Sequence, residues 1–396
     1  MKLDLYQLCD KKHNKGSIKT TLNKNLKNKI KEALKLLRKH KIKLKDISNQ
    51  IGIKYSTLWK YLNKYDTISL NILMELENIS KINFNEDIGE IVSNHGKVKL
   101  KVPKNISPDL ARIIGAIVAD GHLSYRKSMR GHHYELVIRE GHKTNMEALS
   151  KWFHKTFDLS IHPKKENNHY TIYISNKIIF KFFNSLIGIP SGKKSDIVSV
   201  PNIILKSDLR IKKAFLQGIF MFDGGVDYRT GYVNLISCSK KLITKINGIL
   251  NEIGIKPDYL NLNPDNFNRY KIRFRKKQNL LKCINLFEQG TEKWFRLREH
   301  LYGLDYETKD LKEALIYFNL YYPRIRKNSI TFSDVIDAIN RLEEADIKHV
   351  SKKIKRSKTV SYEFLKKLEN WNILSSKRKN LKNIWEINSV IKYPRR

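Results

Sequence analysis

The stretch LARIIGAIVADG at residues 110–121 has a counterpart further along the chain, AFLQGIFMFDG at residues 214–224. Each is an apolar run with small residues at helical spacing that stops at Asp-Gly. This spacing predicts a buried helix, and the glycine predicts its end by reversing the chain. The carboxylates of Asp120 and Asp223 are therefore expected at helix C-termini. A helix dipole disfavours an anion there, so each needs a cation or a hydrogen bond from the turn.

The two stretches are related by one constant offset, because 223 − 120 = 103 and the other aligned pairs give the same difference. The aligned positions are Ala111, Gly115, Asp120 and Gly121 with Ala214, Gly218, Asp223 and Gly224. One copy alone would fit an ordinary buried helix followed by a polar turn. Two copies predict a duplicated domain, and a divalent metal is the functional candidate for offsetting two carboxylates.

The pair resembles the two LAGLIDADG motifs of homing endonucleases, of the DOD type found in archaeal introns and inteins. The resemblance covers about residues 100–305. It implies an α+β fold in which two αββαββα units form one pseudo-symmetric saddle. Both motif helices would pack at its centre, and the concave sheets would straddle DNA. We expect the halves to occupy residues 99–205 and 206–304.

Patterns of apolar residues give the same element order in both halves. After the helix that starts at Ser107-Pro108-Asp109, the first half continues as the hairpin HLSYRKS and HHYELVIRE, a helix from about Lys143 to Phe157, strands LSIHPKK and NHYTIYIS, and the helix NKIIFKFFNSLIG. The second half continues as the hairpin GVDYRTGYVNLIS, the helix KKLITKINGILNEIG, strands KPDYLNL and NRYKIRFRK, and the helix NLLKCINLF. The two halves therefore agree element by element.

The resemblance assigns roles to residues at the ends of the motif helices. It implies that Asp120 and Asp223, with Gly121 and Gly224 beside them, hold Mg²⁺ or Mn²⁺ for phosphodiester hydrolysis. One site would cut each strand and leave short 3′ overhangs. It also implies a catalytic basic residue near each metal. The candidates are Lys194 of the run GKKS and Lys293 of GTEKW.

Four further residues are expected where the two motif helices meet. They are Gly115 and Gly218, which let the backbones approach, and Ala119 and Phe222, which precede the acids. Phe222 departs from the family pattern, in which the residue before the acid is small. Its ring either turns into the core or widens the gap between the acids. Nicking of one strand and loss of cleavage both stay open.

Charge predicts a polyanionic partner. Lysine and arginine number 77 against 39 acids, a formal net charge of +38, and nucleic acid is the first choice. An AT-rich coding sequence would also enrich lysine, asparagine and isoleucine, but it would not remove acids. No apolar span approaches the ~18 residues that cross a membrane, and the N-terminus MKLDLYQLCDKKHNKG lacks a signal-peptide pattern. We expect a cytoplasmic monomer without a membrane partner.

Metal ligands of the zinc type are not indicated. The three cysteines Cys9, Cys238 and Cys283 are widely spaced and expected to be free thiols. A loose histidine group has no ligand spacing on a helix, which favours polar residues facing a groove. This group comprises His122, His132, His133 and His142.

The N-terminal residues 1–98 predict a helix-turn-helix domain. Residues 1–23 are expected to be a flexible lead-in, and LKNKIKEALKLLRKH an amphipathic helix. The segment KDISNQIGIKYSTLWKYL predicts two helices around a tight turn, with a generic helical hairpin as the alternative. SLNILMELENIS predicts a further helix, and VKLKVPKNISP a linker. The second helix of the helix-turn-helix would present Lys54, Tyr55, Ser56, Thr57 and Lys60 to a major groove.

Residues 305–396 predict a winged-helix domain, with a solvated basic tail as the alternative. The pattern gives three helices and then two short strands joined by a basic loop. The expected DNA contacts are Ser361 and Tyr362 on a helix, and Lys377, Arg378 and Lys379, with Lys382, at the wing tip. In the saddle, the expected contacts are Tyr125, Lys127, Arg139, Arg229, Arg273 and Arg275.

Three functions stay open. The first is a site-specific endonuclease acting on double-stranded DNA with a long target. The second is a regulator that binds DNA without cutting it, as in bacterial proteins that fuse a degenerate LAGLIDADG domain to a helix-turn-helix. Those lack the two acids, whereas both are present here. The third is an intron maturase acting on RNA, which charge alone does not separate from DNA.

Flanking modules of the DNA-binding type favour DNA over RNA. Protein splicing is not expected of this sequence, because it begins Met-Lys and ends YPRR, without the Cys or Ser start and His-Asn end that splicing needs.

Overall fold

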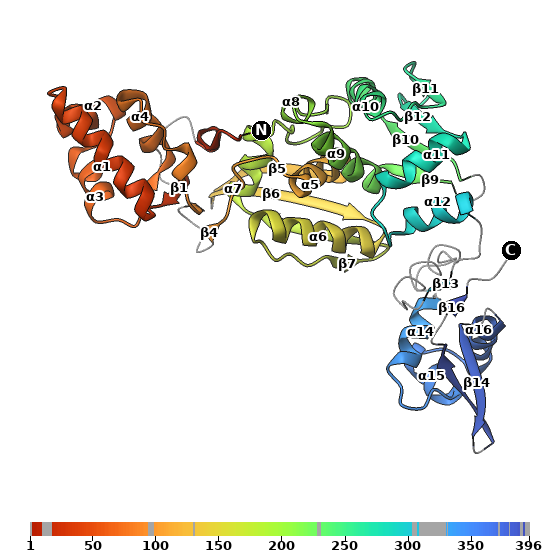
Figure 1. Cartoon of the computed structure of the whole chain (residues 1–396). Helices are drawn as coiled ribbons and strands as arrows, with labels where there is room; N and C mark the ends of the chain where they lie inside the picture. Colours follow the sequence, from red (N-terminus) through yellow and green to blue (C-terminus); the bar gives the residue numbers. More distant parts are fainter. Residues whose placement is uncertain are drawn as a thin grey trace. The chain divides into compact units, whose positions relative to one another are not determined.

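A computed structural model of the chain describes residues 2–9, 18–93, 99–129, 131–227, 231–302, 307–308, 330, 332–370, 373–379, 381–388 and 391–392. It consists of two compact units (Figure 1). The first is Met1–Asp223, Ile236–Gly254 and Asn261–Tyr270, and the second is Gly224–Leu235, Ile255–Leu260 and Lys271–Arg396. Among the described residues, no helix has the length and apolar character that crossing a bilayer requires.

Four helices form the N-terminal part of the first unit. They are α1 (Lys24–Lys39), α2 (Leu44–Ile51), α3 (Tyr55–Asn63) and α4 (Leu70–Ser80). Ile47, Ser48 and Ile51 of α2 are buried as predicted. Gly52 ends α2 with φ 75°, a left-handed conformation that glycine adopts without strain. The tight turn between α2 and α3 is therefore present.

A small antiparallel sheet corrects the expected lead-in and linker. Its strands are β1 (Ile18–Thr21), β2 (Thr67–Ser69), β3 (Ile91–Ser93) and β4 (Lys99–Leu100), in the order β2-β1-β3-β4. Residues 5–8 form the 3₁₀ helix η1 (Leu5–Leu8), with both leucines buried. Residues 2–9 and 18–23 are therefore not a flexible lead-in. Apolar side chains from these short segments join the core around α4.

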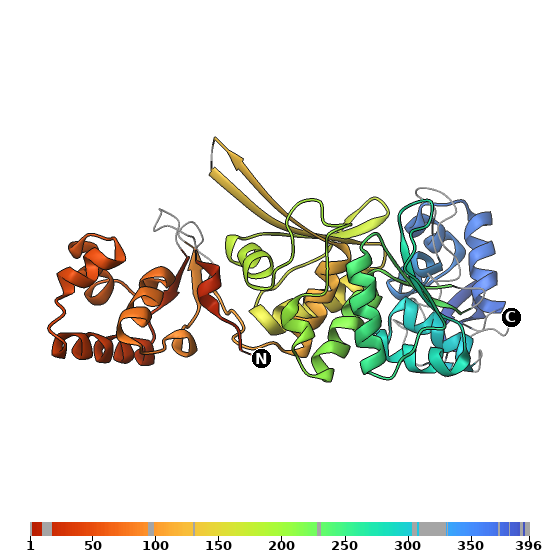
Figure 2. The ribbon, with the colours of Figure 1, turned by 90° about the horizontal axis from the view of Figure 1, so that it is seen from above.

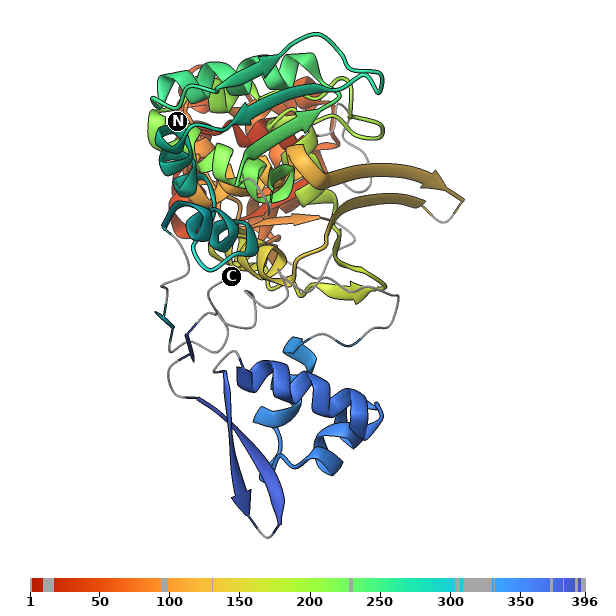
Figure 3. The same cartoon turned by 90° about the vertical axis from the view of Figure 1, so that its right-hand side faces the viewer.

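The first half of the saddle begins with α5 (Pro108–Asp120), which Ser107 caps through its hydroxyl. It continues as β5 (Gly121–Ser128), β6 (Gly131–Glu140), α6 (Lys143–Phe157), β7 (Lys164–Glu166), β8 (His169–Ser175), α7 (Lys177–Lys181) and the π-helical turn η3 (Phe182–Leu186). The sheet order is β5-β6-β8-β7. The β5–β6 hairpin extends as a long ribbon from the body of the unit (Figures 2 and 3).

The second half repeats this arrangement. After α8 (Asn202–Leu205) come α9 (Leu209–Phe222), β9 (Gly224–Val226), β10 (Val233–Ser237), α10 (Lys240–Glu252), β11 (Tyr259–Asn261), β12 (Tyr270–Phe274), α11 (Lys277–Cys283), the 3₁₀ turn η4 (Ile284–Leu286) and α12 (Glu292–Tyr302). The sheet order β11-β12-β10-β9 equals that of the first half read backwards. The duplicated α+β fold is confirmed.

The two motif helices α5 and α9 lie side by side (Figure 1). An added Cβ on Gly115 would lie 2.3 Å from the carbonyl oxygen of Phe215, and one on Gly218 would lie 2.1 Å from that of Arg112. Both distances are far inside van der Waals contact. The backbones therefore touch at these glycines, and a side chain at either position would push the helices apart.

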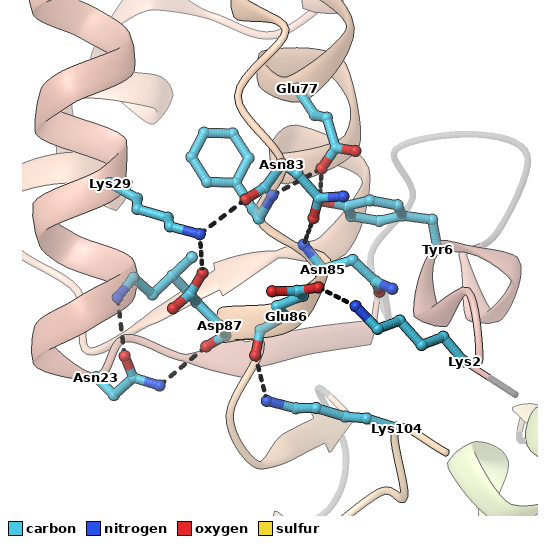
Figure 4. A network of polar contacts seen from close by, with 12 residues as sticks. Lys2, Tyr6, Asn23, Lys29, Glu77, Asn83, Asn85, Glu86, Asp87 and Lys104 are labelled. Carbon is cyan, nitrogen blue, oxygen red and sulfur yellow. Dashed lines mark hydrogen bonds and ion pairs between the residues drawn. The ribbon is translucent and has the colours of Figure 1, made fainter. Parts of the chain in front are cut away.

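A polar network joins the N-terminal segment to α4 and to the residues that lead into α5 (Figure 4). Lys2 forms an ion pair with Glu86, whose carbonyl oxygen accepts a hydrogen bond of 2.6 Å from Lys104. The Tyr6 hydroxyl donates to Glu77 over 2.8 Å. Burial, and then the carboxylate of Glu77, raise the pKa of Tyr6, so the hydroxyl stays a donor.

The C-terminal part of the second unit contains α14 (Phe332–Asn340), α15 (Ile347–Ile354) and α16 (Lys358–Asn370), followed by the hairpin β14 (Leu374–Lys379) and β15 (Lys382–Ile387). The pair β13 (Glu307–Thr308) and β16 (Ile391–Lys392) flanks them in sequence. These helices and the hairpin share one core, which includes Val335, Val350, Leu365, Leu368 and Trp385. The element order is the predicted one.

Replacing Gly115 or Gly218 by alanine should destabilise the first unit, because each Cβ meets backbone atoms that no rotamer change can move. We expect a loss of about 1–3 kcal/mol or more in the free energy of unfolding, measured by urea denaturation. Gly248 in α10 is the matched control. A Cβ there meets nothing within 4 Å, so Gly248→Ala should be neutral or stabilise by up to about 1 kcal/mol. Equal effects at all three sites would contradict the close packing.

Candidate functional site

Both motif acids lie at helix C-termini, as predicted. Asp120 is the last residue of α5, and Asp223 caps α9 with its N–H donating to the carbonyl of Ile219 over 2.9 Å. The predicted chain reversal at Gly121 is wrong. Gly121 has φ −77° and ψ 145°, so the chain runs straight from α5 into β5. Neither Gly121 nor Gly224 is among the described glycines with positive φ.

Crowding explains the glycine at position 121 instead. An added Cβ would lie 2.6 Å from the Cα atom of Ile117 in the preceding helical turn. The residue after Asp120 must therefore lack a side chain so that the strand can leave the helix at this angle. The carboxylate is exposed at the point where helix and strand meet.

Lys194 supplies the cation that the acid at the end of α5 requires. Its Nζ donates to the carbonyl oxygens of Ile117, Val118 and Ala119, the last over 2.9 Å. These are carbonyls that a helix end leaves without partners. The ammonium thus caps the negative end of the α5 dipole directly beside Asp120.

Burial lowers the pKa of Lys194 to about 8, while the charges of Asp223 and Asp120 act in the opposite direction. One ammonium therefore interacts electrostatically with both motif acids. Sequence reasoning identified this lysine from the run GKKS. Its neighbour Lys193 is exposed.

Other polar groups support the ends of the two helices. The buried side chain of Asn145 in α6 donates to the carbonyl of Met221, 3.0 Å away, in the last turn of α9. Near the other end of the helix pair, Arg112 donates to Gln217 over 2.9 Å and forms an ion pair with Asp109. Sequence reasoning missed Asn145, because a single asparagine within a helix pattern carries no positional signal.

Phe222 is buried, with 5% of its surface exposed. It lies four residues after Gly218 and seven after Phe215, so helical geometry places it on the face of α9 that meets α5. The smaller Ala119 is partly buried. The ring therefore occupies the interface beside Asp223.

Lys293 lies in the second unit, whereas Asp120, Asp223 and Lys194 lie in the first, so its catalytic role stays a prediction. It is buried in the first turn of α12, next to Glu292. Glu292 forms an ion pair with Arg296, whose guanidinium also donates to the carbonyl of Val226 over 3.2 Å.

This ion pair holds the strand that follows Asp223. Burial raises the pKa of Glu292, and the charges of Arg296 and Lys293 lower it. A buried pair of this kind costs several kcal/mol when one partner is removed. The sequence shows the pair only as glutamate and arginine four residues apart, a spacing that usually occurs on exposed helix faces.

The predicted contacts of the N-terminal domain lie at the start of α3. Lys54, Tyr55, Ser56 and Lys60 are exposed, and Thr57 is partly buried. In the saddle, Tyr125, Lys127 and Arg139 are exposed on β5 and β6. Arg229 lies outside the described residues.

Two arginines of β12 and the residue after it are held by neighbours. Arg273 donates to the side-chain oxygen of Asn234. Arg275 lies over the rings of Tyr232 and Tyr259, 5.6 and 5.8 Å from their centroids. Such contacts fix the guanidinium orientation before any ligand binds.

In the C-terminal part, the predicted contact Ser361 is wrong. It is fully buried, and its hydroxyl donates to the carbonyl of Ser357 over 2.9 Å. Ser361 lies four residues before Leu365 and seven before Leu368, on the core face of α16. Tyr362 is exposed. So are Lys377, Arg378 and Lys379 at the end of β14, and two of them form ion pairs within the domain.

The donor set fits a hard divalent cation. Asp120 and Asp223 offer carboxylate oxygens, which Mg²⁺ and Mn²⁺ prefer, and Mg²⁺ typically binds one or two carboxylates together with water and phosphate oxygens. Across the described residues, no group of three or more histidine, cysteine or acidic side chains could hold a metal. His132 instead stacks on Tyr125 and hydrogen-bonds to its hydroxyl over 2.6 Å.

Two helices touching at glycine, each ending in Asp-Gly and each followed by its own four-stranded sheet, define a LAGLIDADG-type fold. Residues 110–190 and 212–293 match the family model of the WhiA LAGLIDADG-like domain. The chain is a LAGLIDADG-type protein, and these two segments correspond to its two halves.

Curated relatives match over part of their length. A glutamine–fructose-6-phosphate aminotransferase of Methanocaldococcus jannaschii is 26% identical over 238 residues, 60% of this chain and 20% of the relative. The catalytic-type chain of an A-type ATP synthase from Pyrococcus abyssi is 26% identical over 157 residues, 40% of this chain and 15% of the relative. A DNA polymerase of a Thermococcus species is 25% identical over 151 residues, 38% and 8% respectively. The matches thus span a fifth or less of each relative.

Solved structures share the fold at low identity. The homing endonuclease I-DmoI in complex with DNA and Mn is 18% identical, with a TM-score of 0.36 over 46% of this chain and 97% of that chain. Full-length WhiA from Thermatoga maritima is 12% identical, with a TM-score of 0.33 over 68% of this chain and 93% of that chain.

Titration of Lys194 should appear in the pH dependence of stability. Its folded pKa of about 8 lies below the ordinary 10.5, so between these values the unfolded chain binds the proton more tightly. The free energy of unfolding in EDTA should therefore gain a contribution as pH rises from about 8 to about 10.5. Urea denaturation of Lys194→Met and Lys194→Arg should lack it. The exposed control Lys193→Met should retain it, and an unchanged profile in both Lys194 variants would contradict the burial of this ammonium.

Proposed function

We propose that this chain is a site-specific, metal-dependent DNA endonuclease. The observation that carries the proposal is the retention of Asp120 and Asp223 at the ends of two touching helices, with the buried ammonium of Lys194 interacting with both. A helix end is an unfavourable place for a carboxylate, and each acid here requires compensation. A purely structural helix pair has no need for either acid.

The site offers what phosphodiester hydrolysis demands. Asp120 and Asp223, with the main chain at Gly121 and Gly224, would hold Mg²⁺ or Mn²⁺. When bound, the metal supplies an activated water and charge to stabilise the attacked phosphate. Lys194 is protonated below pH about 8 and adds positive charge near both carboxylates. Lys293 is proposed for the same role in the second half.

The curated relatives support a self-contained module. Their names describe an aminotransferase, a component of an ATP synthase and a DNA polymerase, which share no reaction. A similar segment that fills a fifth or less of each cannot account for three unrelated activities. It is better explained as a unit with an activity of its own.

Charge and exposure support double-stranded DNA as the partner. The net charge is +38, and exposed basic residues lie on α3, on the β5–β6 hairpin and at the end of β14. We propose that residues 1–98 act as a helix-turn-helix domain and residues 305–396 as a winged helix, flanking the halves at 99–205 and 206–304. Contacts from several modules would give a long target site for a cytoplasmic monomer.

Neutralising either motif acid should abolish cleavage and leave DNA binding intact. A saturating library of plasmid targets incubated with Mg²⁺ should yield nicked or linear product with the unaltered protein. Asp120→Asn and Asp223→Asn should each reduce the rate by about 100-fold or more, because the metal contributes several kcal/mol to the transition state. Asp196→Asn, at an exposed acid two residues from Lys194, is the matched control and should cut normally.

The ratio of nicked to linear product tests the effect of Phe222. If the ring displaces one acid, nicked circles accumulate. If neither form arises from any target, while both Asp→Asn variants bind as tightly as the unaltered protein, the endonuclease proposal is wrong.

A DNA-binding regulator without cleavage is the second candidate. It is favoured by the match to the WhiA LAGLIDADG-like domain and by the burial of Phe222 beside Asp223. Sequencing of genomic fragments retained by the protein separates the candidates. An endonuclease should retain one long site that it cuts in Mg²⁺, whereas a regulator should retain uncut promoter fragments.

A further inference from the structure

A groove in the N-terminal part of the first unit lies between α1 and the segment from α3 to Asp66, on a different face of α3 from the predicted major-groove contacts. Its volume is about 1120 Å³. Tyr55 and Trp59, one helical turn apart, line it from α3, whereas Ser56 and Lys60 do not. Helix α3 therefore presents two distinct faces.

The opposite wall of the groove is strongly basic. Lys27, Lys31, Lys35 and Arg38 follow one another along one face of α1 at spacings of four, four and three residues. They span about 16 Å of helix. In all, the lining holds seven lysine or arginine residues and a single acid, Asp66. Such a stripe suits an extended chain of negative charges.

Aromatic rings are exposed along the same groove. Tyr55 is 50% exposed, Trp59 39% and Tyr65 46%, all within eleven residues of sequence. The ammonium of Lys64 lies 5.6 Å from the centroid of the Trp59 ring and orients it. The floor between the walls is apolar, formed by Ile30 and Leu34 among others. Folding alone does not require three large rings at the surface.

We propose that this groove binds single-stranded nucleic acid. Phosphates would follow the basic stripe of α1, and unpaired bases would stack on Trp59, Tyr55 and Tyr65. Cationic grooves interleaved with exposed rings bind single strands because each unpaired base presents a flat face. A duplex presents only base edges, since its faces are stacked on one another. An acidic peptide would use the lysines but would leave the rings unused.

This inference does not depend on the proposed cleavage, because it concerns neither Asp120 nor Asp223. It assigns the N-terminal domain a second ligand besides duplex DNA. An endonuclease or a regulator that opens or meets melted DNA would have a place to hold the separated strand. DNA and RNA share the chemistry that the groove recognises, so the test includes both.

Fluorescence anisotropy of the full chain with dye-labelled twelve-residue oligothymidine, oligouridine and a mixed-sequence duplex tests the proposal. Trp59→Ala should weaken binding of the single strands by about 5- to 100-fold, the effect of losing one stacked base. It should weaken duplex binding much less. Lys31→Glu should weaken single-strand binding and make it less dependent on salt.

Leu36→Ala and Lys39→Glu are the matched controls. Both residues are exposed on α1 and outside the groove, so neither change should affect single strands as strongly as its partner does. Lys60→Ala, on the other face of α3, should leave single-strand binding unchanged. Circular dichroism verifies that each variant is folded.

Position is tested by photo-crosslinking of 5-iodouracil-labelled oligonucleotides followed by peptide mapping. Crosslinks within residues 55–65 support the groove. The proposal is overturned if Trp59→Ala and Leu36→Ala bind single strands equally, if Trp59→Ala weakens duplex and single strand alike, or if polyglutamate competes as well as oligothymidine. A preference for oligouridine or oligothymidine identifies the strand as RNA or DNA.

Discussion

The contact of two helix backbones at Gly115 and Gly218 is the constraint on which the central fold depends. Each glycine faces a carbonyl oxygen of the other helix at a distance that leaves no room for a methyl group. Because the helices touch there, their C-terminal ends and the acids on them are brought to one place. The sheets of both halves then follow from helices whose positions are already set.

Close packing creates an electrostatic problem that the connection between the halves solves. Two carboxylates at neighbouring helix C-termini repel each other and oppose both dipoles. Lys194, in the segment between η3 and α8, donates to the last carbonyls of α5 and is close enough to both acids to feel their charge. Burial makes the ammonium less stable, which is the cost of placing it there. The same groups would make a cation site favourable.

The central fold could be predicted because long amphipathic helices and alternating strands repeat at one offset. The N-terminal sheet could not, because its strands have two to four residues and pair with partners far away in sequence. The burial of Ser361 was readable in principle from its spacing to Leu365 and Leu368. At the site, the two acids and Lys194 followed from the motif. Glu292 and Arg296 did not, since their spacing is typical of exposed pairs.

The single ammonium that both acids feel has a consequence for how the site would respond to ligands. Two carboxylates with separate counter-charges would titrate independently, but two that share one form a coupled system. A proton or a cation arriving at Asp120 changes the field of Lys194 and, through it, the affinity at Asp223. The duplicated halves are thus joined at their centre by a common charge as well as by the peptide chain, and neither acid behaves as the copy of the other.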